Sequence, residues 1–232
     1  MIKTRVLLPA IGLAILTLAG SNLFAQDAPQ MTLAERSPFT QLADAPPSGY
    51  VTLFSNLGPS NDAYDDEQGW AITGPDSNAV FGYQNIAVPY TPTSNSTILG
   101  LQVALLYYGS GTNAGAIAIL SDSNGLPGNL IKFWNVSNLP KIGTCCKLVT
   151  VTDPAGINVT AGTQYWIAVG TDKPSDTAYD SWDWTYKDLD QGPYAFQGTN
   201  TQGMWEPDTG QLPAYAIYGT VPTTIIVATS PR

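Results

Sequence analysis

The chain has 232 residues, of which 44% are hydrophobic and only 12% are charged, a composition that excludes a globally disordered protein. With 9 basic and 18 acidic residues, no histidine and a formal net charge of −9, it is poorly suited to bind nucleic acid or anionic membrane surfaces. Frequent Gly, Pro, Tyr and Trp beside few charges favour β-structure over helix bundles.

The N-terminus has the pattern of a secretory signal. Lys3 and Arg5 precede the apolar run VLLPAIGLAILTLAG, and Ala25 follows as a small residue at a cleavage point. The apolar run is shorter than the ~20 residues that span a membrane. We therefore expect residues 1–25 to be a cleaved signal peptide and the mature protein to be secreted and extracellular, with a net charge of −11 once Lys3 and Arg5 are removed.

The rest of the chain divides into three segments. Residues 26–48 show no sustained period and end in a Pro-Pro-Ser turn, which predicts a flexible leader. Residues 49–220 alternate short apolar runs with turns, which predicts one β-sandwich domain. Residues 221–232 hold a brief apolar patch that is too short to span a membrane, so we expect a C-terminal tail and no membrane span in the mature chain.

Apolar residues between 49 and 220 recur with a period of two, as on one face of a strand. Three such runs predict core-facing residues: Leu99, Leu101, Val103, Leu105 and Tyr107; Ile117 and Ile119; Tyr165, Ile167 and Val169. Turn signals such as SNGLPGN and DPAG separate the runs. We predict an all-β fold of about ten strands, an antiparallel β-sandwich with jelly-roll-like connections.

Several stretches are similar to a known family. The runs NLGPSNDAYDDEQGW, SDSNGLPGNL, AGTQYW and LPAYAIYGT resemble the choice-of-anchor R domain of secreted bacterial proteins, over residues 50–220. The resemblance implies an exported β-rich domain, and it implies no catalytic residues. Members of that family carry surface-sorting signals at the C-terminus, and no Pro-Glu-Pro-type tail follows Thr220. We therefore expect release rather than surface attachment.

The two cysteines, Cys145 and Cys146, are adjacent. Neighbouring Cα atoms lie ~3.8 Å apart, below the ~4.4–6.8 Å of ordinary disulfides, and such a bridge closes almost no loop. A zinc site needs more ligands than two thiolates in a chain without histidine. A vicinal bridge and two unbridged thiols therefore both stay open, and in either form we expect the pair to shape a local turn.

The densest aromatic and acidic stretch runs from 179 to 196, YDSWDWTYKDLDQGPYAF. If it is a strand, alternate aromatic residues line one face, which suits either a buried core stripe, the favoured interpretation, or a sugar-binding platform. Rings in such a platform cover the apolar faces of a pyranose, and carboxylates accept bonds from its hydroxyls. The residues of this candidate platform are Trp182, Asp183, Trp184, Tyr186, Trp205 and Glu206.

Calcium is a second candidate ligand. Oxygen ligands cluster on two turns, with Asp62, Asp65 and Asp66 on the first and Asp122 and Asn124 on the second. The second turn lacks the glutamate of an EF-hand loop, and Asp and Asn are common in turns without any ion. We expect no other cofactor.

Without histidine, neither a Ser-His-Asp triad nor histidine-ligated zinc can form. Glycoside hydrolysis needs only two carboxylates, and the candidates are Glu67 and Glu206 with Asp62, Asp65, Asp183 and Asp208 as partners. The leading hypothesis is a non-catalytic protein that binds polysaccharide or extracellular matrix weakly at the cell surface. The alternatives are a carboxylate-dependent glycoside hydrolase and a structural component of an extracellular assembly.

Overall fold

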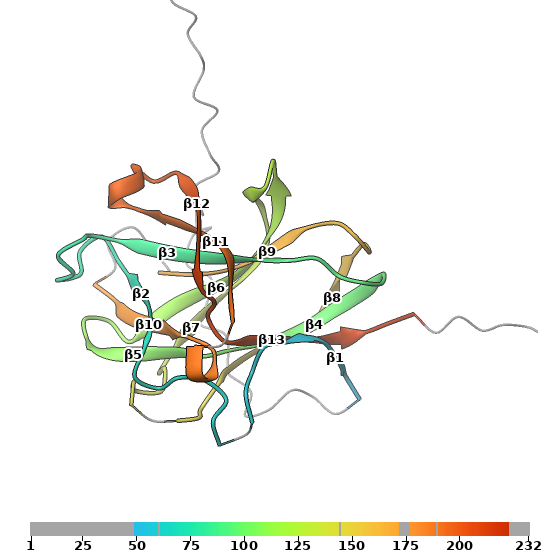
Figure 1. Ribbon diagram of the computed structural model, residues 1–232, viewed down its shortest axis with the longest axis horizontal. Coiled ribbons are helices and arrows are strands. Elements are labelled where there is room, and N and C mark those ends of the chain that lie inside the picture. Colours follow the sequence, from blue (N-terminus) through green and yellow to red (C-terminus); the bar gives the residue numbers. More distant parts are fainter. Residues whose placement is uncertain (1–48, 60, 144, 172–176, 189, 223–232) are drawn as a thin grey trace, which may run out of the picture.

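The computed structural model describes residues 49–59, 61–143, 145–171, 177–188 and 190–222. These residues form two antiparallel sheets (Figure 1), so the predicted all-β sandwich is confirmed. The predicted signal peptide, the leader and most of the predicted tail lie outside the described residues. The jelly-roll connectivity stays a prediction. Within the described part of the chain, no helix has the length and apolar character needed to cross a membrane.

The smaller sheet has four strands. Their order is β1 (Val51–Ser55), β13 (Tyr215–Thr220), β4 (Ser96–Val103) and β8 (Val149–Val159). The strand β13 is central, and it pairs with β1 through Val51 opposite Gly219 and with β4 through Ile217 opposite Leu101.

The larger sheet has nine strands. Its main order is β5 (Leu105–Ser110), β10 (Tyr179–Asp183), β2 (Gly69–Thr73), β3 (Gln84–Tyr90), β9 (Tyr165–Gly170), β6 (Ala114–Ser123) and β7 (Leu126–Ser137). A hairpin of β11 (Gln191–Gly198) and β12 (Trp205–Gln211) joins this sheet by pairing with β3. Two short 3₁₀ turns, η1 (Tyr186–Asp188) and η2 (Thr199–Thr201), flank β11.

The main core lies between the two sheets. Predicted inward residues of β4, β5, β6 and β9 are fully buried in it: Leu101, Val103, Leu105, Ile117, Ile119, Ile167 and Val169. Strands β7 and β8 close one side, because the Trp134 indole N–H donates to the Thr152 carbonyl at 3.0 Å and Lys132 Nζ lies 2.9 Å from Asp153 Oδ2. The alternating apolar pattern therefore identified the core faces of these strands correctly.

The prediction for Leu99 is wrong. Strand β4 has an extra residue there, because Ile98 lies opposite Gly219 while Gly100 lies opposite Tyr218. Such a β-bulge reverses the alternation of side chains on either side of it. Ile98 is therefore fully buried and Leu99 only half-buried. The DPAG sequence, expected to be a turn, instead forms an irregular part of β8.

A small second core lies on the outward side of β5. Leu105 faces the main core, whereas the next residue, Leu106, is buried with Ala63, Tyr64 and Ala214 beneath loops. The side chains of Leu57, Ile142, Cys146 and Leu148 pack against this cluster from two loops. We call residues 57–59 and 61–68 the first covering loop, and residues 138–143 and 145–148 the second covering loop. They bring residues far apart in the sequence to one end of the larger sheet.

Candidate ligand-binding site

The predicted platform of alternating aromatic residues does not form, because the strand ends too early. Strand β10 ends at Asp183, Trp184 makes only an isolated bridge to Pro213, and Tyr186 begins η1. Trp182 has 0% exposure, and its indole N–H donates to the Ala214 carbonyl at 3.1 Å. The core interpretation therefore holds for Trp182.

The remaining platform residues are also dispersed. Trp205 has 4% exposure and belongs to a separate cluster with Trp166. Glu206 is exposed on β12, and Tyr186 is half-buried with the Lys187 ammonium 4.9 Å from its ring centre. The six predicted residues thus do not share one open surface.

A different site lies on the outward face of β2, β5 and β10. It is a pocket of about 340 Å³ beside Trp184. Trp182 points into the main core. Tyr179 and Ser181 lie an odd number of positions away from Trp182 on β10, so their side chains point to the opposite face, toward the pocket. The residues that carry its chemistry are Glu67, Gln68, Tyr108, Tyr179, Ser181 and Trp184.

A pair of stacked tyrosines forms one wall of this pocket. The rings of Tyr108 and Tyr179 are 4.7 Å apart with an angle of 16° between their planes. Tyr108 has 52% exposure. The pair therefore presents an aromatic face to solvent that is fixed by two neighbouring strands, β5 and β10.

Trp184 joins the pocket to a set of aromatic rings at this end of the protein. Its ring meets Trp70 edge to face at 5.6 Å, and Trp70 contacts Tyr194 at 4.7 Å. The backbone of Trp184 is held on both sides, since its N–H donates to the Gln68 carbonyl and its carbonyl accepts from the Asp65 N–H, each at 3.0 Å. The ring is thus held in position before any ligand arrives.

Asp183 lies buried under the first covering loop. The Ser181 hydroxyl donates to Asp183 Oδ1 at 2.5 Å, and a Cβ at Gly69 would lie 2.7 Å from that same oxygen. Only glycine at position 69 leaves room for this carboxyl group. The pKa of Asp183 is raised to about 8, mainly by burial; the Ser181 hydrogen bond opposes this rise, and the charges of Asp65 and Asp66 contribute to it. Asp183 is therefore mainly protonated at neutral pH.

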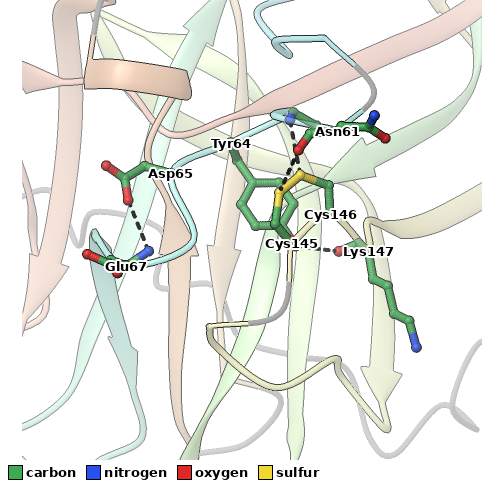
Figure 2. The surroundings of a disulfide bond; sticks show 8 residues. Asn61, Tyr64, Asp65, Glu67, Cys145, Cys146 and Lys147 are labelled. Atoms are coloured by element: carbon green, nitrogen blue, oxygen red, sulfur yellow. Dashed lines mark hydrogen bonds between the residues drawn. A yellow bond between two sulfur atoms is a disulfide. The ribbon is translucent and has the colours of Figure 1, made fainter.

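The adjacent cysteines join the two covering loops (Figure 2). Cys145 and Cys146 form a disulfide across a cis peptide bond. The Ala63 N–H donates to Cys146 Sγ at 3.1 Å, and Cys145 Sγ lies 3.7 Å from the Asn61 carbonyl oxygen. The latter is a contact and not a hydrogen bond, because a bridged sulfur carries no hydrogen. The bridged form of the pair, which the sequence left open, is thus the form present.

Two further bonds hold these loops at the edge of the pocket. The Tyr64 hydroxyl donates to the Lys147 carbonyl at 3.2 Å, and the Gly143 N–H donates to the Asp66 carbonyl at 3.0 Å. The pocket takes Glu67 and Gln68 from the first covering loop and Ile142 from the second. The disulfide therefore stands next to the junction that shapes one side of the pocket.

Reduction of the disulfide is expected to lower the melting temperature by only a degree or two. The reason is that a bridge between adjacent residues removes almost no conformational entropy from the unfolded chain. Calorimetry of the mature protein with and without a thiol reductant measures this difference. A fall of ten degrees or more would show that the bridge holds the whole fold together.

The turns expected to bind calcium are held by protein hydrogen bonds. Asp122 Oδ1 accepts from Gln164 Nε2 at 2.7 Å and from the Trp166 indole at 2.9 Å, and its other oxygen accepts from the Gly125 N–H at 3.0 Å. Among the described residues, no three His, Cys, Asp or Glu side chains are placed to hold a metal ion. The predicted calcium ligands Asp62, Asp65, Asp66, Asp122 and Asn124 thus have no support in the described geometry.

The sequence did not single out Tyr108, Tyr179 or Gln68, although the doublet of tyrosines at the end of β5 is a visible signal of an exposed aromatic residue. Comparison with known proteins finds no family model that matches the chain, no curated protein that matches it and no solved structure that matches it. The resemblance to the choice-of-anchor R domain accordingly stays an expectation, and function has to be argued from the geometry.

Proposed function

We propose that this protein is a secreted, non-catalytic carbohydrate-binding β-sandwich that binds a saccharide in the pocket beside Trp184. The observation that carries the proposal is the stacked pair of Tyr108 and Tyr179, half-open to solvent on the wall of a pocket that also contains Glu67, Gln68 and Ser181. The sugar-binding role predicted for the Trp182 platform is thereby assigned to the opposite face of β10.

The arrangement suits the two kinds of surface that a sugar presents. A pyranose has faces of C–H groups that pack on aromatic rings, and a rim of hydroxyls that needs hydrogen-bond partners. The tyrosine pair supplies the rings, while Glu67 and Gln68 supply a carboxylate and an amide at the pocket edge. A volume of about 340 Å³ is at the lower end of the ~300–1,000 Å³ of ligand pockets, which suits a small saccharide unit.

Catalysis is less well supported than binding. Hydrolysis of a glycosidic bond needs two carboxyl groups that reach the substrate. Asp183 has the raised pKa of a general acid, but its side chain is completely buried. The lining carboxylates are Glu67, which is exposed, and Asp180, which is buried. One accessible carboxylate supports binding rather than bond cleavage.

A structural role in an assembly through the β12 edge is not supported. Such a role needs a free, apolar sheet edge, and β12, which pairs only with β11 among the described strands, is one of the outer strands together with β1, β8, β5 and β7. Its exposed residues include Glu206, Pro207 and Asp208, and charges and proline on an edge strand oppose further pairing.

The Tyr108→Ala variant is expected to bind oligosaccharide about tenfold more weakly than the wild type. Loss of the exposed ring removes most of the stacking surface, and aromatic contacts of this kind contribute ~0.5–1.5 kcal/mol beyond area burial, where 1.4 kcal/mol is tenfold. A glycan array first selects the best soluble oligosaccharide, and titration calorimetry then measures its dissociation constant for both proteins.

Tyr218→Ala is the matched control. Tyr218 is a half-buried tyrosine on β13 of the other sheet, and its hydroxyl donates to Gln102 at 2.8 Å. The control should bind like the wild type. Three results would each contradict a non-catalytic sugar site here. They are absence of binding to any oligosaccharide, equal affinities of the two variants, and the appearance of new reducing ends through hydrolysis of the selected ligand.

A further inference from the structure

The rim of the pocket is acidic. Glu67 is exposed in the lining, and Asp65 and Asp66 precede it on the first covering loop. Among the described lining residues there is no lysine or arginine. Two lysines belong to the second covering loop itself, Lys141 before Ile142 and Lys147 after the disulfide. Figure 2 shows Lys147 directed away from Asp65 and Glu67.

The acidic rim is held in a defined shape. Asp65 Oδ1 accepts the backbone N–H of Glu67 at 2.9 Å and of Gln68 at 3.1 Å. Its second oxygen lies 3.4 Å from the Gln68 side-chain amide. Because these bonds fix the turn before ligand arrives, Glu67 is presented at the pocket with little ordering cost.

The charges of this rim act on two buried groups, Asp183 and Tyr64. Burial raises the pKa of Asp183, and the charges of Asp65 and Asp66 raise it further. Burial also raises the pKa of Tyr64, and the charge of Asp66 acts in the same direction. The negative charges of Asp65 and Asp66, which add to these shifts, also attract a cationic ligand.

The aromatic wall favours a cation as well. Ring faces attract ammonium groups within about 6 Å of their centres. The protein already shows this twice, with Lys132 Nζ 5.8 Å from the Trp134 ring centre and Lys187 Nζ 4.9 Å from the Tyr186 ring centre. The faces of Tyr108 and Tyr179 beside Glu67 combine the same attraction with a carboxylate.

We propose that the pocket selects a positively charged saccharide, an amino-sugar unit whose protonated amine lies at Glu67 while its ring packs on the Tyr108–Tyr179 pair. This inference rests on the carbohydrate-binding function proposed above and names its ligand class. Neutral sugars bind more weakly because they make no ion pair with Glu67. Uronic-acid sugars bind most weakly because their carboxylates meet the acidic rim.

Titration calorimetry with oligomers of equal length tests the order of affinity. The probes are oligomers of β-1,4-linked glucosamine, of β-1,4-linked N-acetylglucosamine and of galacturonic acid. We expect glucosamine oligomers to bind about fivefold tighter than the N-acetylated ones, as one partly exposed ion pair allows. Added salt should weaken this advantage, since it screens exposed charges.

The variant Glu67→Gln is expected to lose about fivefold in affinity for glucosamine oligomers and much less for the N-acetylated oligomers, because glutamine keeps a hydrogen-bond acceptor without the charge. Glu206→Gln is the matched control. Glu206 is another exposed glutamate, on β12 and outside the described lining, so the control should bind like the wild type.

The outcomes separate the two proposals. Equal or tighter binding of the N-acetylated oligomers, with no selective effect of Glu67→Gln, overturns the charge preference and leaves the carbohydrate site standing. Binding of galacturonate oligomers in preference to the others overturns the charge preference in the same way. Failure of every one of these oligosaccharides to bind overturns both proposals.

Discussion

Replacing Trp182 with alanine is expected to lower the free energy of unfolding by about 3–5 kcal/mol, as truncation of a buried tryptophan does. Its ring is completely buried between the sheets and meets Tyr215 edge to face at 6.0 Å. The variant also leaves the Ala214 carbonyl without the indole donor. Urea unfolding of the mature protein measures the change, which is a large part of the stability of an ordinary domain.

Trp182→Phe provides the control for this change, because it keeps an aromatic ring in the core and loses only the indole hydrogen bond and some volume. It should cost clearly less than the alanine variant. If Trp182→Ala unfolds at the same urea concentration as the wild type and loses only ligand affinity, the burial of this residue is refuted and the original platform hypothesis regains its basis.

The stability of the wild type is expected to fall as the pH rises from about 4 to about 8, and Asp183→Asn should remove most of this dependence. The pKa of Asp183 rises from its ordinary 3.8 to about 8 in the folded protein. Between these pH values the folded state binds one proton more than the unfolded state, so the free energy of unfolding decreases with pH. The contribution is fully present below pH ~4 and is lost above pH ~8.

The effect of Asp183 is large because each pKa unit corresponds to about 1.4 kcal/mol, which gives several kcal/mol across the interval. An asparagine has the shape of the protonated acid and does not ionise, so the variant should be more stable than the wild type at pH 9. Urea unfolding at several pH values measures both proteins.

Asp208→Asn serves as the matched control for the pH series. Asp208 is an exposed carboxylate whose pKa is lowered by hydrogen bonds from the Thr209 N–H and the Tyr194 hydroxyl, so it titrates below the interval. Its variant should keep the pH dependence of the wild type between pH 5 and 9. Parallel curves for the wild type and Asp183→Asn would show that the Asp183 carboxyl is ionised in the folded protein.

The core faces could be predicted where the strands are regular. Ile117 and Ile119 on β6, and Ile167 and Val169 on β9, alternate without interruption and lie in the core. Leu99 could not be placed, because the bulge in β4 depends on its partner strands, which the local sequence does not specify. The run from 97 to 109 likewise hides a change of sheet between Val103 and Leu105.

The candidate site was less predictable than the fold. The sequence pointed to the stretch around Trp184 as a ligand site, which stays a prediction. It treated Trp182, Trp184 and Tyr186 as one strand face, whereas β10 ends at Asp183. Tyr108 meets Tyr179 only because β5 pairs with β10, and this contact joins residues that are distant in the chain. Composition and periodicity carry no signal for such a pairing.

The most direct test of the pocket is an NMR titration of the mature protein with glucosamine and N-acetylglucosamine oligomers. The protein has six tryptophans, and each indole N–H gives a separate reporter signal. We predict that the Trp184 indole and the backbone amides of Gln68, Tyr108 and Tyr179 shift together, while the indoles of Trp182 and Trp205 stay in place. Shifts confined to Trp205 and its neighbour Glu206, or no shift with either oligomer, would contradict the site.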